Sequence, residues 1–260
     1  MISCADCRTF VYRLRMRIAI VVLALAVSPL LQPAPSPSVL SVLASGAVEG
    51  SIVALQGTVP ATLRFETSQG ISARLAAGDT PDVLIAQSAL VDQLIEDGKA
   101  LADSRAPIGR MPIGVAVSRG ARHPDISSAS ALKAAILNAN AVVISQGASG
   151  AYLEAQFRAM GISDAIQSKL RREARGDDVM KRIGESGGNT IGFTMVSEIK
   201  YGERHGGAYV GPLPAAMQNY TAYDAVVMRA SRSLEAAHAF VRALRDPAAR
   251  RVLAANGWEF

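Results

Sequence analysis

Cysteine, histidine and aromatic residues are scarce in this chain of 260 residues, which has two cysteines, three histidines, one tryptophan and 5% aromatic residues in all. Cys4 and Cys7 have the CxxC spacing of redox sites, but both precede a segment that we predict to be removed. The remaining chain therefore cannot form a disulfide framework. It also lacks the cysteine after an apolar leader that a lipid-anchored protein needs.

Metal-binding and nucleic-acid-binding patterns are also lacking. His123 and His205 stand near no cysteine and no acid pair at ligand spacing, so we predict no metal site and no cofactor. The adjacent acids at 177–178 are typical of charges at a helix start. The arginine pairs at 171–172 and 250–251 are not interleaved with aromatic residues, so we predict no nucleic-acid partner.

The first 33 residues have the pattern of a secretory signal: four arginines precede an apolar run at 18–27, and a proline- and serine-rich stretch follows. The run is shorter than the roughly 20 residues of a membrane span, and no later segment is apolar enough to anchor the chain. We therefore predict a signal peptide at 1–33 and a mature chain in the periplasm or otherwise exported, without membrane insertion. Met16 offers a second start, which would make 1–15 an over-extension, and both starts remain open.

Removal of the signal also changes the charge balance. The formal net charge of the full chain is +5. Without residues 1–33 the chain has 23 basic and 21 acidic residues, so the high isoelectric point of the full chain does not predict binding to nucleic acid. Half of all residues are hydrophobic, which is enough for a folded core in one domain or two lobes.

Short apolar or β-branched runs alternate with helical patterns from Val39 onward. This alternation predicts an α/β fold with mostly parallel sheets and helices on both faces. The predicted strands are 39–44, 61–65, 83–86, 113–118, 141–145, 190–193 and 222–228. The predicted helices lie around 90–95 and 131–136, and at 234–244 and 247–255.

No linker divides the middle of the chain. Instead, the extended segments 113–118 and 222–228 could run side by side between two lobes as a hinge of two crossover strands. We therefore predict a discontinuous first lobe at 38–108 plus 226–260 and a second lobe at 109–225.

Three predicted strand-to-helix junctions, at 45–47, 67–70 and 147–150, carry small and hydroxyl-bearing residues. The first N–H groups of a helix have no internal partner and attract anions. Helix capping alone explains any one junction. Three of them at the carboxyl ends of strands favour a ligand site, because ligands of open α/β sheets bind at that edge.

Several segments in this order resemble the molybdate-binding proteins of ABC importers. They are VLASGAVEG at 42–50, RFETSQGISARLAAGDTPDVLIAQSALVDQL at 64–94, IGVAVSRG at 113–120, GASGAYLEAQFRAMGI at 147–162 and VGPLPAAMQNYTAYDAVVM at 210–228. The resemblance covers nearly all of the mature chain. It implies the two-lobed type II periplasmic binding fold and a monomeric receptor that closes over a small oxyanion, molybdate or tungstate, and delivers it to an inner-membrane ABC permease.

The resemblance also implies a set of ligand-binding residues, one group at each of five junctions. They are Ser45, Gly46 and Ala47; Thr67 and Ser68; Ser149 and Gly150; a position near Val179; and Thr194 and Met195. Ala47 stands where the family usually has serine, and Met195 where it has tyrosine. Both departures remove a donor, so another small anionic solute remains open as the ligand.

Two other classes of protein are alternatives to a binding protein. Residues 147–151 imitate the nucleophile elbow of α/β-hydrolases, with Ser149 as nucleophile and Asp224 and His238 following in hydrolase order. His238 lies inside a helical pattern, whereas a triad histidine normally projects from a loop, so we predict a binding protein rather than an enzyme. The effector module of a transcription regulator fits less well, because an export signal is present and a helix-turn-helix is not.

Overall fold

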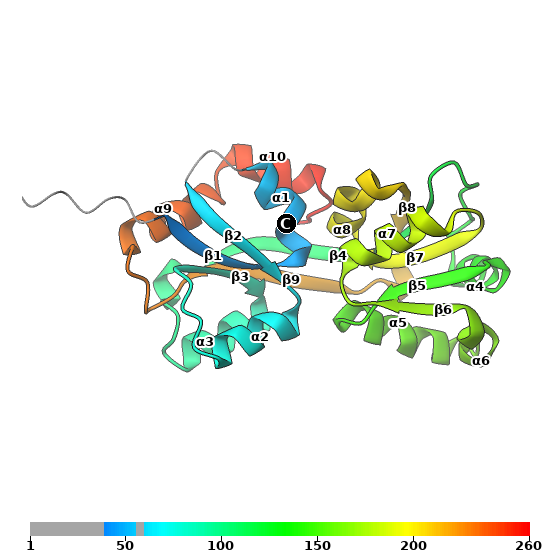
Figure 1. The fold of residues 1–260 in the computed structure, drawn as a ribbon, viewed down its shortest axis with the longest axis horizontal. Helices are drawn as coiled ribbons and strands as arrows, with labels where there is room; N and C mark the ends of the chain where they lie inside the picture. Colours follow the sequence, from blue (N-terminus) through cyan, green and yellow to red (C-terminus); the bar gives the residue numbers. More distant parts are fainter. Residues whose placement is uncertain (1–38, 56–59) are drawn as a thin grey trace, which may run out of the picture. The chain divides into compact units, whose positions relative to one another are not determined.

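Strands and helices alternate along the computed structural model, which describes residues 39–55 and 60–260 (Figure 1). The strands are β1 (Leu40–Ser45), β2 (Ala61–Glu66), β3 (Val83–Gln87), β4 (Ala106–Ser118), β5 (Ala141–Ser145), β6 (Leu170–Glu173), β7 (Thr190–Met195), β8 (Gly207–Pro212) and β9 (Tyr220–Val227). The helices are α1 (Glu49–Ala54), α2 (Ser68–Ala76), α3 (Ser88–Glu96), α4 (Ala129–Asn138), α5 (Ala148–Ala159), α6 (Ser163–Ile166), α7 (Gly176–Ser186), α8 (Val196–Gly202), α9 (Leu234–Ala243) and α10 (Pro247–Ala255). The predicted signal peptide, with Cys4 and Cys7, lies outside the described residues.

The strands form two sheets that share β4, in the order β2-β1-β3-β9-β4-β7-β5-β6, with β8 also paired to β4. Residues 106–112 of β4 pair with β9, and residues 113–118 pair with β7 and β8. We call the part built on β1, β2, β3 and β9 the first lobe and the part built on β5, β6, β7 and β8 the second lobe. The predicted two-lobed α/β fold is confirmed, with antiparallel pairs added by β4, β8 and β9.

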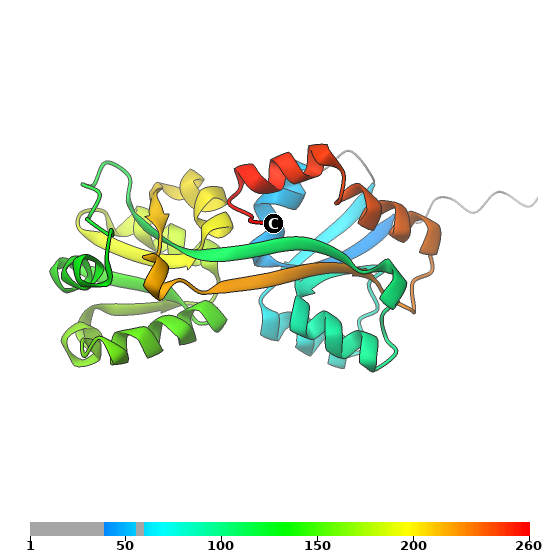
Figure 2. The same ribbon diagram turned by 180° about the vertical axis from the view of Figure 1, so that it is seen from behind.

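Strands β4 and β9 run side by side as the connection between the lobes (Figure 2). The whole of β9 pairs within the first sheet, so the change of sheet falls between Pro112 and Ile113 of β4. Residues 109–112 and 220–225, which the predicted boundaries assign to the second lobe, therefore pair in the first sheet.

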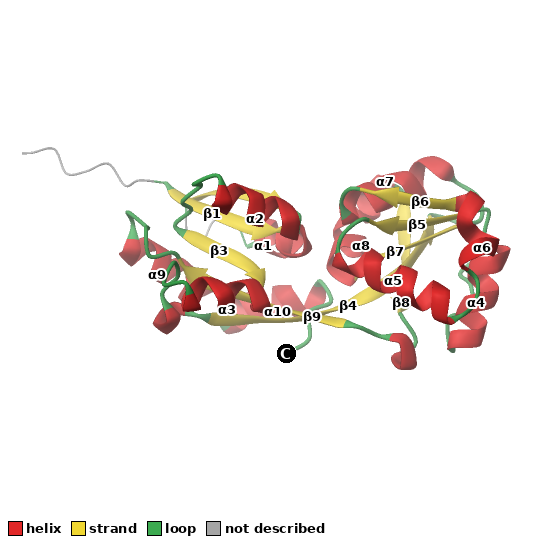
Figure 3. Ribbon diagram, turned by 90° about the horizontal axis from the view of Figure 1, so that it is seen from below, coloured by secondary structure: helices red, strands yellow, loops and turns green. Residues whose placement is uncertain are grey.

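Helices cover both faces of each sheet (Figure 3). Successive residues of one strand consequently enter different cores. In β5, Val142 and Ile144 join the large core, while Val143 packs with α7 and α8. In β3, Val83 and Leu84 are likewise divided between two cores. Burial on both faces is why these strands appear in the sequence as continuous apolar runs rather than alternating ones.

The lobes also touch through α8, which packs on α1. The hydroxyl of Ser197 donates a hydrogen bond to the carbonyl of Ala47 at 2.5 Å. Gly50 of α1 leaves the room that Tyr201 of α8 occupies, because a β-carbon there would stand 2.7 Å from that side chain. The second lobe is thus joined to the first by side-chain packing as well as by the crossover strands.

Candidate functional site

A small cavity of about 60 Å³ lies where the strand-to-helix junctions of the two lobes meet. The first lobe lines it with residues 45–47 after β1, 66–69 after β2 and Gln87 after β3. The second lobe lines it with Ser145 and residues 147–149 around the end of β5, residues 174–176 after β6, and Met195 and Glu198 after β7. Tyr223 of β9 completes the lining.

Seven of the ten predicted ligand-binding residues line this cavity: Ser45, Gly46, Ala47, Thr67, Ser68, Ser149 and Met195. The other three are not in its lining. Gly150 packs against the carbonyl of Ser145, and Thr194 is fully buried. Val179 is a core residue one turn into α7, so Arg175 and Gly176 stand at the fourth junction in its place.

The first-lobe hydroxyls cap the turns on which they lie. Ser45 accepts a hydrogen bond from the N–H of Ala47 at 3.4 Å, and Thr67 accepts one from the N–H of Gly70 at 3.1 Å. A hydroxyl that accepts in this way still carries one hydrogen to donate. Capping and anion binding are therefore compatible roles for both residues.

The second-lobe hydroxyls form a buried pair. The Oγ atoms of Ser145 and Ser149 lie 2.9 Å apart, at the end of β5 and in the first turn of α5. Gly150 permits this closeness, because a β-carbon there would stand 1.7 Å from the carbonyl oxygen of Ser145. One hydroxyl of the pair can donate to the other and leave the second hydrogen for a ligand.

Glu198 was not predicted, and it changes the fifth junction. Its Oε2 accepts hydrogen bonds from the hydroxyl of Thr194 and from the N–H of Met195, the latter at 3.3 Å. The donors that the sequence assigned to the ligand are thus occupied by a carboxylate of the chain itself. Burial is the main cause that raises the pKa of Glu198, while these hydrogen bonds and the charge of Arg175 oppose the rise.

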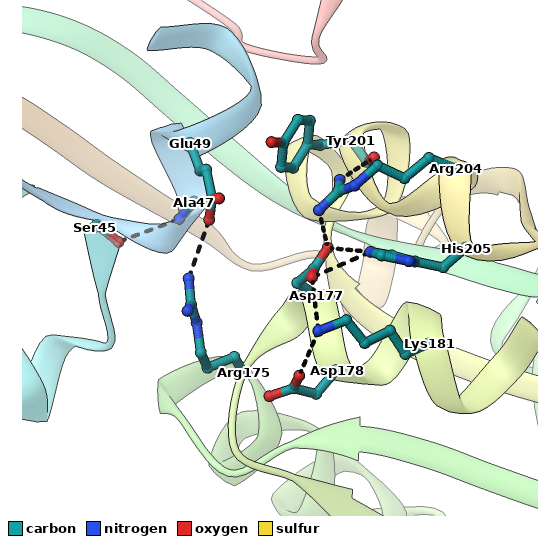
Figure 4. Close-up of polar contacts among 10 residues, drawn as sticks. All are labelled: Ser45, Ala47, Glu49, Arg175, Asp177, Asp178, Lys181, Tyr201, Arg204 and His205. Atoms are coloured by element: carbon teal, nitrogen blue, oxygen red, sulfur yellow. Dashed lines mark hydrogen bonds and ion pairs between the residues drawn. The ribbon is translucent and has the colours of Figure 1, made fainter. Parts of the chain in front are cut away.

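Arg175 was also not predicted as a site residue, although it lines the cavity. From the residue before α7 it reaches across to α1, where its Nη2 lies 3.0 Å from Oε2 of Glu49 (Figure 4). This ion pair joins the two lobes beside the cavity. The side chain of Arg175 is 40% exposed, so the ion pair contributes only about 0–1 kcal/mol to stability and does not oppose a rearrangement around a ligand.

Asp177 is not among the residues that line the cavity, and its carboxylate contacts three basic side chains. Its carboxylate contacts Arg204 at 2.8 Å, His205 at 3.1 Å and Lys181 at 3.3 Å (Figure 4). Within the described ranges, no cluster of three or more histidine, cysteine, aspartate or glutamate side chains could hold a metal ion.

Tyr223 brings a phenol into the cavity from the crossover strand β9. Its ring packs edge-on against Trp258 with centroids 5.3 Å apart. Burial raises the pKa of Tyr223 far above its usual value, and the nearby charge of Glu198 adds to this, while hydrogen bonds with Ser45 and Gln87 oppose it. The phenol therefore stays neutral and keeps its hydrogen. It is the same kind of donor as the tyrosine that Met195 replaces in this chain.

The hydrolase alternative gains no support from the site. Ser149 is paired with Ser145, and Asp224 is held by Arg105, whose Nε lies 2.8 Å from the carboxylate. His238 lies on α9, and no hydrogen bond of the described residues joins it to Ser149 or Asp224.

The raised pKa of Glu198 predicts a pH-dependent stability. The folded chain binds this proton more tightly than the unfolded chain, so the free energy of unfolding should fall as the pH rises from about 4.5 through the folded pKa, and then level off. Glu198→Gln should remove this fall and make the chain more stable than the wild type at pH 8. Urea unfolding between pH 4.5 and 8 measures the effect, with the exposed Glu96→Gln as control; parallel curves for wild type and Glu198→Gln would refute it.

Comparisons with known proteins agree with this architecture. Residues 54–259 match the family model described as bacterial extracellular solute-binding protein. The chain belongs to this family. An aconitate isomerase from a Pseudomonas species is 30% identical over 242 residues, which cover 88% of this chain and 90% of that protein.

Solved structures share the fold at lower identity. The periplasmic molybdate-binding protein of Azotobacter vinelandii aligns with a TM-score of 0.69 and 16% identity over 85% of this chain and 99% of its own. A sulfate-binding protein from Mycobacterium tuberculosis aligns with a TM-score of 0.57 and 16% identity over 84% and 85% of the two chains. Among the described residues of this solute-binding protein, no helix has the length and apolar character needed to cross a membrane.

Proposed function

We propose that this solute-binding protein is the receptor of an ABC importer and captures a small oxyanion, with molybdate and tungstate as the first ligands to test. The observation that carries the proposal is the small cavity in which hydroxyls from both lobes meet the starts of α2, α5 and α7. Its volume of about 60 Å³ suits a ligand of a few heavy atoms.

The chemistry of the lining favours an anion. Helix starts present N–H groups without internal partners, and the helix dipole favours negative charge there. Hydrogen bonds to a charged ligand contribute about 1.5–3 kcal/mol each, so several of them offset the loss of hydration. Arg175 adds a positive charge at the rim.

Hinge closure would complete the site. The cavity is lined by both lobes, and the lobes are connected by β4 and β9. A ligand that contacts both lobes binds the closed form more tightly than the open one and shifts the population toward it. We propose that the permease recognises this closed form.

A thermal-shift titration tests the ligand class. The chain from Ser38 onward should melt at higher temperature with molybdate or tungstate, because a ligand that binds only the folded state stabilises it by about 2.7 kcal/mol at 100 times its dissociation constant. Sulfate and phosphate complete the panel. No shift with any of the four would overturn the oxyanion assignment.

Loss of single hydroxyls should weaken binding without unfolding the chain. Ser68→Ala and Ser149→Ala each remove one donor at the cavity, so each should raise the dissociation constant roughly 10- to 150-fold, as expected for a hydrogen bond to a charged ligand worth about 1.5–3 kcal/mol. Ser72→Ala, on the exposed face of α2, is the matched control. Calorimetric titration gives the constants, and unchanged affinity in both cavity variants would place the site elsewhere.

Isomerisation of an unsaturated polycarboxylate is a second candidate function. The relative named aconitate isomerase raises it, and the placement of Glu198 favours it. Such an isomerisation needs a base that takes a proton from carbon and returns it, and a carboxyl with a raised pKa near a cation suits that role. Proton NMR with cis- and trans-aconitate provides the test: turnover that Glu198→Gln abolishes would support an enzyme, and its absence in the wild type would refute one.

A further inference from the structure

The two carboxylate oxygens of Glu198 have different surroundings. Both of its hydrogen bonds within the described chain end on Oε2, from Thr194 and Met195. Oε1 lies toward the first lobe, 3.6 Å from the point where a β-carbon on Gly46 would stand. Because Gly46 and Glu198 both line the cavity and Oε1 lies beside Gly46, we infer that Oε1 is the oxygen that a bound anion meets.

The hydrogen of a protonated Glu198 belongs on Oε1. An ionised carboxylate only accepts hydrogen bonds, whereas a carboxylic acid also donates one. Since two donors already point at Oε2, the acid hydrogen would stand on Oε1 and face the cavity. Two negative oxygens at contact distance repel strongly in a partly dry site. A hydrogen must therefore lie between Oε1 and a ligand oxygen.

We propose that a bound anion shares one hydrogen with Oε1 of Glu198, so that the cavity takes up an anion and one proton together. This inference rests on the proposed capture of anions. The hydrogen comes from the ligand when the ligand carries an O–H group, as hydrogenphosphate and hydroxy acids do. It comes from solvent, and resides on Glu198, when the ligand is fully ionised like sulfate or molybdate. Glu198 thereby becomes the residue that selects among anions.

The charges around Glu198 help it to take up the proton. The titratable or charged groups around it are Arg175 and Asp177 at the start of α7, Tyr223 of β9 and Glu66 of β2, with Glu49 of α1 as the ion-pair partner of Arg175. Glu66 and Glu49 are paired with Arg74 and Arg175, at 2.7 Å and 3.0 Å. Burial and Asp177 raise the pKa of Glu198, and Arg175 only partly opposes them.

Matched pairs of anions test the shared hydrogen. Sulfate and phosphate differ mainly in the O–H group, as do succinate and malate. Calorimetric titrations of the chain from Ser38 onward at pH 5, 6, 7 and 8 would give the dissociation constants. We expect the affinity for the fully ionised member to fall about tenfold for each pH unit above the pKa of Glu198, as uptake of one proton requires. Phosphate, succinate and malate themselves titrate within this range, so each affinity is expressed per concentration of the dianion. On that scale the affinity for the member with an O–H group should change by less than about threefold.

Glu198→Gln serves as a permanent mimic of the protonated acid. Its amide keeps an acceptor for Thr194 and Met195 and offers an N–H group in place of the acid hydrogen. We expect sulfate to bind this variant with an affinity that is independent of pH, so that the preference for phosphate at pH 8 disappears. Circular dichroism verifies the fold of the variant.

The outcomes separate the two proposals. Wild-type affinities that stay constant with pH for both members of a pair would overturn the shared hydrogen and leave anion capture intact. Silence from all four anions at every pH, together with no thermal shift with molybdate or tungstate, would overturn both. The pH series on the wild type needs no variant, so it decides the question even where Glu198→Gln fails to fold.

Discussion

Replacement of Trp258 by alanine is expected to lower the free energy of unfolding by about 3–5 kcal/mol, the usual cost of removing a large buried aromatic side chain. Trp258 is 3% exposed and lies after α10, near the C-terminal end of the chain. It packs edge-on against Tyr223 of β9. Its Nε1 donates to the hydroxyl of Ser51 on α1 at 3.1 Å. The side chain therefore holds three separate segments of the first lobe together.

Two milder variants separate packing from hydrogen bonding. Trp258→Phe keeps an aromatic ring beside Tyr223, and Ser51→Ala keeps the indole but leaves its N–H unpaired, which costs about 1–3 kcal/mol. Urea unfolding followed by circular dichroism compares the three variants. A loss in Trp258→Ala no larger than that in Ser51→Ala would show that the ring contributes little beyond its hydrogen bond.

Gly150→Ala is expected to destabilise the chain by about 1–3 kcal/mol or more and to weaken anion binding at least tenfold. The new methyl group would stand 1.7 Å from the carbonyl oxygen of Ser145, so the first turn of α5 must move away from β5. That movement would separate the hydroxyls of Ser145 and Ser149, which now lie 2.9 Å apart at the cavity.

Gly147→Ala is the matched control for this prediction. Gly147 lies three residues earlier at the same junction, and a β-carbon there would meet no atom within 4 Å. Its stability should stay within about 0.5 kcal/mol of the wild type. Thermal unfolding of both variants tests the pair, and equal losses of stability would contradict the steric cause. Calorimetric titration of Gly150→Ala against the wild type measures the change in affinity, and Gly147→Ala is a control for stability only because Gly147 lines the cavity.

The fold was predictable where burial leaves a mark on the sequence. Strand β5 and helix α10 have the predicted bounds. Both faces of β5 and one face of α10 are apolar, so their patterns were clear in the sequence. Two strands escaped prediction. β6 is four residues long and mostly charged, and β8 contains two glycines and a proline. The prediction also missed the first half of β4, residues 106–112. This half contains Pro107, Gly109 and Pro112, and interior strands usually avoid proline and glycine.

The candidate site was predictable only for residues that follow a strand directly. Hydroxyls next to apolar strands identified the junctions of β1, β2 and β5. Arg175 follows β6, a strand that the sequence did not predict, so its junction was predicted only as a position near Val179. Tyr223 lies within β9, and its contact with the junction of β1 depends on the pairing of strands distant in sequence. Glu198 did leave a signal: an acid three residues after a strand end has the spacing of a capping box.

The change of sheet within β4 has a consequence for the order in which the chain can fold. The second lobe is continuous from Ile113 to Pro212, so all of its strands are available before residues 213–260 are. The first lobe must wait for β9 to pair with β3, across more than a hundred intervening residues. Long-range pairing of this kind slows folding. We expect the second lobe to fold early and the first lobe to fold late. The first lobe is complete only when Trp258 packs against Tyr223, which lines the cavity.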